Sequence, residues 1–287
     1  MGRRPATVHG MLIVDKPAGM TSHDVVARLR KRLGERRIGH AGTLDPDATG
    51  VLVVGVGKAT RLLRFASGSF KTYEVEIVFG TETDTLDASG EVVASHEMFV
   101  DKSSVIAAAK GLTGEIQQVA PMVSARRVNG RRLHDLAREG LEVERDARPV
   151  TVSRFDIEAS EDPLIWRARI DCSAGTYVRT LGADLGTALG GGAHIRALRR
   201  VASGVYTLSE AGTIEEAPLR PVIELVRGID QVVLNEQEQS LVRNGGKLGL
   251  NRTKGEGPWA LVDTSQELIA VHENIDDRVV VGVVLPP

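Results

Sequence analysis

The sequence predicts an α+β fold, in which a mixed, mainly antiparallel sheet forms the core and a small β-rich module follows at the C-terminus. The composition supports a globular chain, because 42% of the 287 residues are hydrophobic and 26% are charged. Strand signals are followed by strands and helices in mixed order instead of strict strand–helix alternation, which favours α+β over α/β. Short strands separated by turns dominate residues 236–287 and predict the terminal module.

The N-terminal elements surround a glycine-rich loop. An apolar run predicts a strand over 11–14. Ser22 is the predicted N-cap of a helix over 23–33, whose apolar side chains share one face and whose opposite face is rich in arginine and lysine. We then expect a loop over 38–50, which contains three glycines and a proline, and an apolar strand over 51–56.

The rest of the chain divides into a larger and a smaller domain. Period-two alternation predicts a strand over 72–79, and a polar turn follows at 84–90. Helical patterns lie over 104–111, 133–139 and 176–189, and strand patterns over 150–157, 166–172 and 193–208. A proline-containing connection over 215–226 precedes a helix over 236–243 and strands over 259–262, 268–271 and 279–285. We therefore expect one domain over 1–215 and a second over 216–287.

The formal net charge of −2 hides an uneven distribution of charge. Residues 1–64 carry a net charge of +7 and residues 121–154 carry +3, whereas residues 201–287 carry −6. A polyanion could bind the two basic segments if they share a face. A solvated helix surface is the favoured explanation of a charge run by itself, so charge alone does not assign a nucleic-acid partner.

Missing signals disfavour several classes of function. Cys172 is the only cysteine, which precludes an internal disulfide and fits a cytoplasmic location. No run approaches the roughly 20 apolar residues of a membrane span. The segment 55–60 lacks the spacing of a phosphate-binding loop, and the histidines lack the spacing of zinc ligands. We therefore expect no metal, no nucleotide cofactor and no membrane partner.

The loop over 38–50 carries the strongest indication of chemistry. An Asp-Pro pair such as Asp45–Pro46 is most often a structural turn. Here, however, three glycines would hold the backbone close to something large, His40 lies in the same loop, and the most basic helix of the chain comes just before it. A carboxylate would repel a bound phosphate, but it suits chemistry on a nucleotide held by surrounding arginine and lysine.

Six segments resemble, in chain order, the motifs of the TruB-type tRNA pseudouridine synthases. They span residues 10–22, 39–50, 71–74, 83–90, 172–181 and 192–200. Each motif alone has low specificity, but their order identifies the chain as a member of this family. The resemblance implies a pseudouridine synthase catalytic core over 1–215 with an RNA-contacting insertion at about 121–154. It also implies a PUA-like fold for residues 216–287, although their net negative charge disfavours strong contact with phosphate.

By this resemblance, the protein converts uridine 55 in the T loop of tRNA to pseudouridine. The glycosidic bond breaks, the base turns and rejoins the sugar through carbon, so neither a redox change nor net hydrolysis occurs and no cofactor is implied. Asp45 matches the essential carboxylate, which acts either as a nucleophile at the sugar or as a base at its 2′ carbon. Arg179 matches the cation that would hold the pKa of this carboxyl group down.

The resemblance also implies the other site residues. Tyr73 matches the aromatic residue that stacks on the target base and helps to remove its carbon-bound proton, and it equally fits a buried strand position. His40 matches the residue that holds the flipped-out RNA conformation, and a satisfied loop histidine is the competing interpretation. The other positions implied to bind substrate are Lys16, Lys71, Asp87, Tyr177 and Leu198. Lys16 also suits a role in buttressing the catalytic loop.

Three hypotheses for function follow. The first is a stand-alone, monomeric enzyme that binds the T arm of tRNA. The second is an RNA-guided relative that works within a ribonucleoprotein, which the simple N-terminus disfavours. The third is a non-catalytic tRNA-binding or folding factor, and the combination of Asp45, Tyr73 and Arg179 argues against it.

Overall fold

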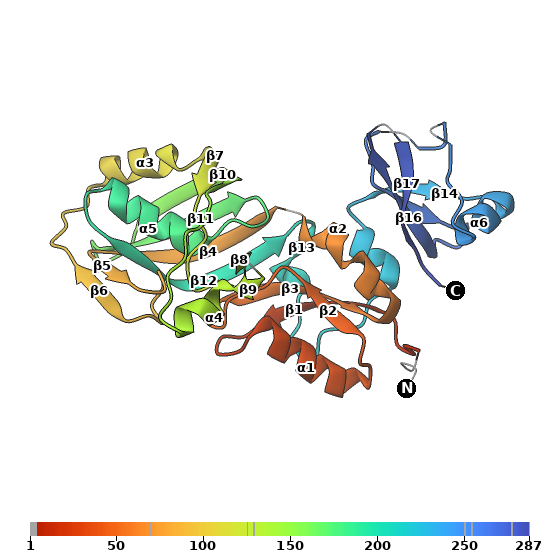
Figure 1. Ribbon diagram of the computed structural model, residues 1–287, viewed down its shortest axis with the longest axis horizontal. Coiled ribbons are helices and arrows are strands. Elements are labelled where there is room, and N and C mark those ends of the chain that lie inside the picture. The colour runs from red at the N-terminus through yellow and green to blue at the C-terminus, as the bar shows by residue number, and fades with distance from the viewer. Residues whose placement is uncertain are drawn as a thin grey trace.

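The fold is α+β, as the sequence predicts, with a mainly antiparallel sheet and a β-rich C-terminal module (Figure 1). The computed structural model describes residues 5–68, 70–124, 126–128, 130–249, 251–253, 255–276 and 278–286. Within these residues the strands form a nine-stranded sheet, a four-stranded sheet and two two-stranded hairpins. No helix of the described residues is long and apolar enough to cross a membrane.

The large sheet has the strand order β1-β3-β12-β4-β11-β10-β7. The bounds are Gly10–Lys16 for β1, Thr49–Val56 for β3, Ala193–Ser203 for β12, Lys71–Phe79 for β4, Ile165–Cys172 for β11, Arg148–Ala159 for β10 and Gly114–Gln118 for β7. Strand β2 (Ile38–Ala41) also pairs with β3, and β13 (Tyr206–Thr207) pairs with β12. The short ladder between β12 and β3 is parallel, and it brings the middle of β12 beside the end of the glycine-rich loop.

Helices cover the sheet from two directions. Helices α3 (Lys102–Gly111) and α5 (Val178–Ala188) pack apolar side chains against β4, β10, β11 and β12 in one core (Figure 1). Helix α1 (Ser22–Leu33) packs its valine and leucine side chains against β1 and β3 in another core. Burial of these apolar stripes is the main stabilising contribution to both layers.

Shorter elements connect the main ones. They are η1 (Gly57–Leu62), α2 (Leu63–Ser67), β5 (Thr81–Thr83), β6 (Val92–Ser95), β8 (Arg127–Val128), β9 (Arg131–Arg132), α4 (Leu133–Arg138), η2 (Leu208–Glu210) and η3 (Val222–Val226). Strands β8 and β9 and helix α4 belong to the arginine-rich insertion predicted at 121–154. Residues 125 and 129 of that segment lie outside the described residues.

The C-terminal sheet has the order β14-β15-β16-β17 and carries helix α6 beside it. The bounds are Asp230–Val233 for β14, Glu236–Arg243 for α6, Trp259–Val262 for β15, Leu268–Ile275 for β16 and Arg278–Val284 for β17. Part of its apolar surface belongs to a core shared with β1, β3 and α2, so the two sheets are packed together through side chains. The domain boundary at residue 215 and a PUA-like identity stay predictions.

Two predicted features around the catalytic loop differ from the structure. Thr21, and not Ser22, caps α1, because the Thr21 hydroxyl accepts the Asp24 backbone N–H while the Asp24 carboxylate accepts the Thr21 N–H. Ser22 instead turns inward and is buried. The predicted loop over 38–50 begins as β2, which pairs with residues 53–56 of β3. It ends as the start of β3, where Gly50 pairs with Lys16 of β1, and Thr49 and Gly50 pair with β12.

Candidate active site

A cavity of about 300 Å³ opens where the loop between β2 and β3, the start of β4, the middle of β12 and the N-terminus of α5 meet. Six predicted site residues line it: Asp45, Lys71, Tyr73, Tyr177, Arg179 and Leu198. The loop after β11 and part of the insertion complete the wall, through residues that include Ser173 and Ser124. The fold therefore gathers residues that lie far apart in the sequence, whereas Lys16, His40 and Asp87 lie outside the lining.

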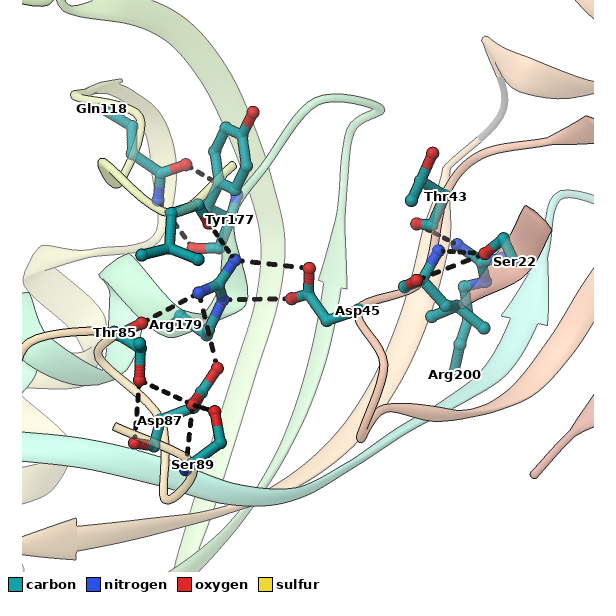
Figure 2. Close-up of polar contacts among 12 residues, drawn as sticks. Ser22, Thr43, Asp45, Thr85, Asp87, Ser89, Gln118, Tyr177, Arg179 and Arg200 are labelled. Carbon is teal, nitrogen blue, oxygen red and sulfur yellow. Dashed lines mark hydrogen bonds and ion pairs between the residues drawn. The ribbon is translucent and has the colours of Figure 1, made fainter. Parts of the chain in front are cut away.

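Asp45 and Arg179 face each other as a two-pronged pair at the edge of this cavity (Figure 2). Arg179 Nε lies 3.0 Å from Asp45 Oδ2, and Arg179 Nη2 donates to Asp45 Oδ1 at 3.3 Å. The Arg179 side chain is 4% exposed and the Asp45 side chain is 40% exposed. The cation is thus a fixed part of the wall, while the carboxylate that it orients is accessible from the cavity.

Other contacts fix the Arg179 guanidinium from behind. Nη1 donates to the backbone oxygen of Thr85 at 2.9 Å, and Nη2 donates to that of Val123 at 2.8 Å. Nη1 also lies 3.4 Å from Asp87 Oδ2. The other Asp87 oxygen accepts hydrogen bonds from Thr85 Oγ1 at 2.8 Å and from Ser89 Oγ at 2.5 Å (Figure 2). Asp87 is therefore placed to position Arg179, and its carboxylate is engaged away from the cavity.

Burial raises the pKa of Asp45, the neighbouring Asp87 carboxylate adds to the rise, and Arg179 and Lys16 oppose it. Arg179 thus lowers this pKa, as expected of the cation, but the loss of water outweighs the ion pair and the net shift is upward. The negative charge of Asp45 consequently lowers the free energy of unfolding, and the ion pair with Arg179 offsets part of this loss. A carboxylate held in this way is more basic than an exposed one.

Lys16 anchors the catalytic loop from beneath. Its side chain is fully buried, and Nζ donates to the backbone oxygens of Pro17, Met20 and Pro46 at 2.8, 2.7 and 2.9 Å. Three accepting oxygens require three N–H donors, which only the ammonium form has. Burial lowers the pKa of Lys16 to about 8. The structure gives Lys16 the buttressing role, since Pro46 directly follows Asp45.

Arg200 is a site residue that the sequence analysis did not single out. It is 1% exposed, and Nε donates to Val51 O at 2.8 Å while Nη2 donates to Gly42 O at 2.9 Å. The positive charge of Arg200 also opposes the rise in the Tyr73 pKa that burial causes. One buried arginine therefore holds both ends of the catalytic loop and acts electrostatically on the aromatic residue of β4.

The sequence contains one indication of the contact made by Arg200, which is the glycine at position 50. Gly50 has a φ of +103°, and a Cβ added there would lie 2.1 Å from the backbone oxygen of Arg200. Only glycine allows this close approach of β3 and β12. The sequence shows that a glycine is present, but not which strand lies against it, because the pairing is between residues 150 positions apart.

Tyr73 and Lys71 project from the same side of β4 into the cavity wall. Tyr73 is 9% exposed, and burial raises the pKa of its hydroxyl group. Lys71 Nζ donates to Ser67 O at 2.7 Å, and burial together with the nearby Arg200 lowers the pKa of Lys71 to about 8. Tyr73 is therefore both a buried residue of strand β4 and a residue of the cavity wall, so the two interpretations that the sequence offered are compatible.

Tyr177 and Leu198 complete the apolar part of the wall. The Tyr177 N–H donates to Gln118 Oε1 at 2.7 Å, and Gln118 Nε2 donates to Tyr177 O at 3.1 Å (Figure 2). Tyr177 also packs against a small apolar cluster that contains Leu133 and Leu136 of the insertion. Leu198 is half-buried in a stretch of β12 where the ladder with β4 is irregular.

His40 lies on β2, outside the cavity lining. Its ring meets the ring of His23 on α1 edge to face, with centroids 5.4 Å apart. Burial, His23 and Arg200 lower the pKa of His40 to about 4, so the ring is neutral at physiological pH. Among the described residues, no group of three or more His, Cys, Asp or Glu side chains is arranged to hold a metal ion.

Comparisons with known proteins give consistent matches to one family. Residues 30–178 match the family model for the N-terminal domain of TruB family pseudouridylate synthase. Residues 179–221 match the model for the C-terminal domain of tRNA pseudouridylate synthase B. The chain is 44% identical to the tRNA pseudouridine synthase B of Mycobacteroides abscessus, with 99% of this chain and 98% of the relative covered.

The chain belongs to the TruB family of pseudouridine synthases. It is therefore an RNA-binding isomerase that forms pseudouridine. Another relative, the tRNA pseudouridine synthase B of an Arthrobacter species, is 46% identical over 88% of this chain and 87% of its own length.

Solved structures show the same fold at lower sequence identity. A chain from an H/ACA RNP bound to a substrate RNA containing 2′-deoxyuridine superimposes with a TM-score of 0.73 and 24% identity, covering 97% of this chain and 85% of that one. A chain from a Cbf5-Nop10-Gar1 complex gives the same TM-score and identity, covering 97% and 84%. The likeness spans the catalytic sheet and the C-terminal module.

Proposed function

We propose that this TruB family enzyme isomerises uridine 55 in the T loop of tRNA to pseudouridine, that Asp45 is its essential carboxylate, and that it acts as a cytoplasmic monomer. The relatives at 44% and 46% identity that carry the name tRNA pseudouridine synthase B support tRNA as the substrate. The observation that carries the role of Asp45 is its two-pronged pairing with buried Arg179 at the cavity.

The reaction needs an ionised and oriented carboxylate by either path. Asp45 attacks the sugar as a nucleophile, or it removes a proton from the 2′ carbon, and in both cases the proton must be absent from the carboxylate. The bond from C1′ to N1 of the base breaks and a bond from C1′ to C5 forms. One proton leaves C5 and one is taken up at N1, so the product is an isomer of the substrate and the reaction requires no cofactor.

The other residues divide into a substrate wall and a supporting layer. A phenol with the ordinary pKa of about 10 is protonated at neutral pH, and burial raises the pKa of Tyr73 further; in this proposal Tyr73 stacks on the target base. Lys71, Tyr177 and Leu198 complete the wall around the flipped-out nucleotide. Extrusion of that nucleotide costs a few kcal/mol, and contacts between the RNA and His40 offset part of the cost.

The test compares two aspartates of the same loop. With unmodified tRNA transcript, Asp45→Asn lowers the single-turnover rate of pseudouridine formation by at least about 10³-fold, the size typical of losing a nucleophile. The dissociation constant of the variant for tRNA stays within about tenfold of the wild-type value. Asp47→Asn is the matched control, because Asp47 is exposed in the same loop, and its rate stays within about threefold.

Each of three other outcomes would contradict the proposal. Product at the wild-type rate from Asp45→Asn would remove Asp45 from the chemistry. Wild-type protein that binds tRNA without forming product would favour the folding-factor hypothesis. Product that appears only after a guide RNA is added would favour the RNA-guided relative.

A further inference from the structure

The outer side of α1 and the turn that follows it form a strongly basic surface. Six cationic side chains there are exposed, and we call them the α1 cationic face: Arg28, Arg30, Lys31, Arg32, Arg36 and Arg37. Figure 1 shows α1 along the outer edge of the molecule, with the sheet on its inner side. This face lies outside the cavity and has no part in the mechanism above.

The hydrogen bonds of this face leave its charge uncompensated. Arg32 donates to the backbone oxygens of Ile214 and Ala217, both at 2.8 Å. Arg30 donates to Ile38 O at 3.2 Å, and Arg37 donates to Thr60 Oγ1 at 2.9 Å. All of these acceptors are neutral. The contacts therefore hold the side chains in place without cancelling their charge.

The two carboxylates of this segment are engaged in other hydrogen bonds, although Arg28 is close enough to Asp24 to help the hydrogen bonds from Thr21 lower the pKa of that carboxyl group. Asp24 accepts hydrogen bonds from its own helix cap, and Glu35 is buried and accepts the backbone N–H groups of Thr7 and Arg37. No carboxylate of the described residues lies within ion-pair distance of the six cations. Exposed arginines on β11 and β12 differ, since Arg167, Arg169 and Arg196 each pair with a glutamate.

Stabilisation of helix α1 explains the presence of only three of these six cations. Cations in the last turn of a helix interact favourably with its dipole, which accounts for Arg30, Lys31 and Arg32. Arg28 lies before that turn, and Arg36 and Arg37 lie after the helix has ended. Like charges at spacings of three and four residues cost about 0.2–0.5 kcal/mol per pair in a helix, so this arrangement disfavours the isolated fold.

The position of α1 connects this face to the active site. The Ser22 hydroxyl accepts the Leu44 N–H at 2.9 Å and donates to Leu44 O at 3.2 Å, so the first turn of α1 is bonded to the residue before Asp45. From there the helix extends about 18 Å outward, given its 12 residues. The cations thus follow a path that leads away from the catalytic loop.

We propose that the α1 cationic face binds the phosphate backbone of the substrate RNA beyond the nucleotides that enter the cavity. The proposal rests on the proposed function only for the identity of that RNA. None of the large exposed hydrophobic side chains lies on this face, so it lacks the apolar centre that is usual in protein interfaces. A dense set of unpaired cations is instead the electrostatic footprint of a nucleic-acid contact.

The test measures how salt changes RNA binding. The variant Arg28→Gln/Lys31→Gln/Arg36→Gln is compared with Arg167→Gln/Arg169→Gln/Arg196→Gln, which removes the same charge from exposed arginines that are already paired. For unmodified tRNA, the slope of log affinity against log salt becomes shallower by about 2 in the α1 variant, since each lost phosphate contact removes nearly one unit. The dissociation constant rises about tenfold, and the control variant changes neither quantity by more than about a third of this.

Two further measurements locate the contact. The single-turnover rate at saturating enzyme stays unchanged in the α1 variant, because no group at the reacting atoms is altered. A short stem-loop, limited to the modified loop and its first base pairs, binds the variant and the wild type equally. Thermal unfolding of both variants shows that each is folded.

An unchanged slope in the α1 variant, or an equal change in the control variant, would overturn the proposal. An equal loss of affinity for the short stem-loop would overturn the placement of this RNA contact outside the cavity. Failure of the proposed function looks different: wild-type protein would then form no pseudouridine in tRNA, whatever the salt dependence of the α1 variant.

Discussion

Cations are used in opposite ways in two regions of this molecule, the active site and the α1 cationic face. In the active site, Arg179, Arg200 and Lys16 are buried, and their N–H groups are directed to carboxylates or backbone oxygens at short distances. On the α1 cationic face, the cations are exposed and meet no carboxylate of the described residues. The same residue types therefore position the catalytic loop and Asp45 in one region, and are available to attract RNA phosphate in the other.

The difference follows from the cost of removing a charge from water. A buried cation without partners is strongly destabilising, so each one in the active site is surrounded by acceptors and becomes rigid. An exposed cation keeps its hydration and can exchange water and counterions for phosphate when RNA arrives. Substitutions in the first region should change the rate, whereas substitutions in the second should change affinity and its dependence on salt.

The largest effect is expected from Arg179→Lys. Lysine keeps the positive charge but cannot present two parallel N–H groups to Asp45, so the orientation of the carboxylate is lost. We expect the single-turnover rate to fall by about 10³-fold, while the salt dependence of tRNA binding stays unchanged. A quench-flow assay of pseudouridine formation measures the first, and titrations at several salt concentrations measure the second. A rate within tenfold of wild type would show that charge alone suffices.

Arg200→Met should have the next largest effect. It leaves the backbone oxygens of Gly42 and Val51 buried without donors, at about 1–3 kcal/mol each, so urea unfolding should show a loss of about 3 kcal/mol or more. The rate should fall roughly 10²-fold because the catalytic loop loses an anchor. Arg199→Met is the control: Arg199 is partly exposed and pairs with Asp15, so its loss should cost about 1 kcal/mol or less. Equal losses in the two variants would contradict the role of Arg200.

The smallest effect is expected on the alkaline side of the pH profile. The pKa of Lys16 is about 8 in the folded protein, and the neutral amine has too few N–H groups for its three acceptors. The rate should therefore fall several-fold as pH rises through about 8. Because folding lowers this pKa, the unfolded chain binds the extra proton between about pH 8 and 10.4, and the contribution of Lys16 to stability rises over that window.

Two variants test whether Lys16 or Lys71 causes this decline in rate at alkaline pH. Lys16→Met should remove the alkaline decline and give a lower rate at all pH values. Lys71→Gln should retain the decline, although the pKa of Lys71 is also about 8. A decline that disappears in Lys71→Gln and persists in Lys16→Met would reverse the assignment.

Sequence reasoning predicted features that depend on local patterns and missed those that depend on distant partners. Helix α1, strand β4 and the Asp45 loop follow from periodicity and glycine spacing, although the cap of α1 is Thr21 and not the predicted Ser22. Strands β7 and β14 and the hairpin of β5 and β6 are short, incompletely buried and partly polar, so their sequences show only faint alternation.

The same division holds in the site. Asp45, Tyr73 and Arg179 lie in recognisable motifs, and the structure places all three at one cavity. The anchoring role of Arg200 could not be predicted, because it depends on which strand lies against Gly50. The net direction of the pKa of Asp45 could not be predicted either, since burial is a property of the folded chain.

The most direct test of this account is a single-turnover series with excess enzyme, repeated across salt concentrations for wild type, Arg179→Lys and the α1 variant. Arg179→Lys should lower the plateau rate at every salt concentration and leave half-saturation unchanged. The α1 variant should leave the plateau unchanged and shift half-saturation, with a shallower salt dependence. If both variants changed the same parameter, the separation between buried cations that position Asp45 and exposed cations that bind RNA would be wrong.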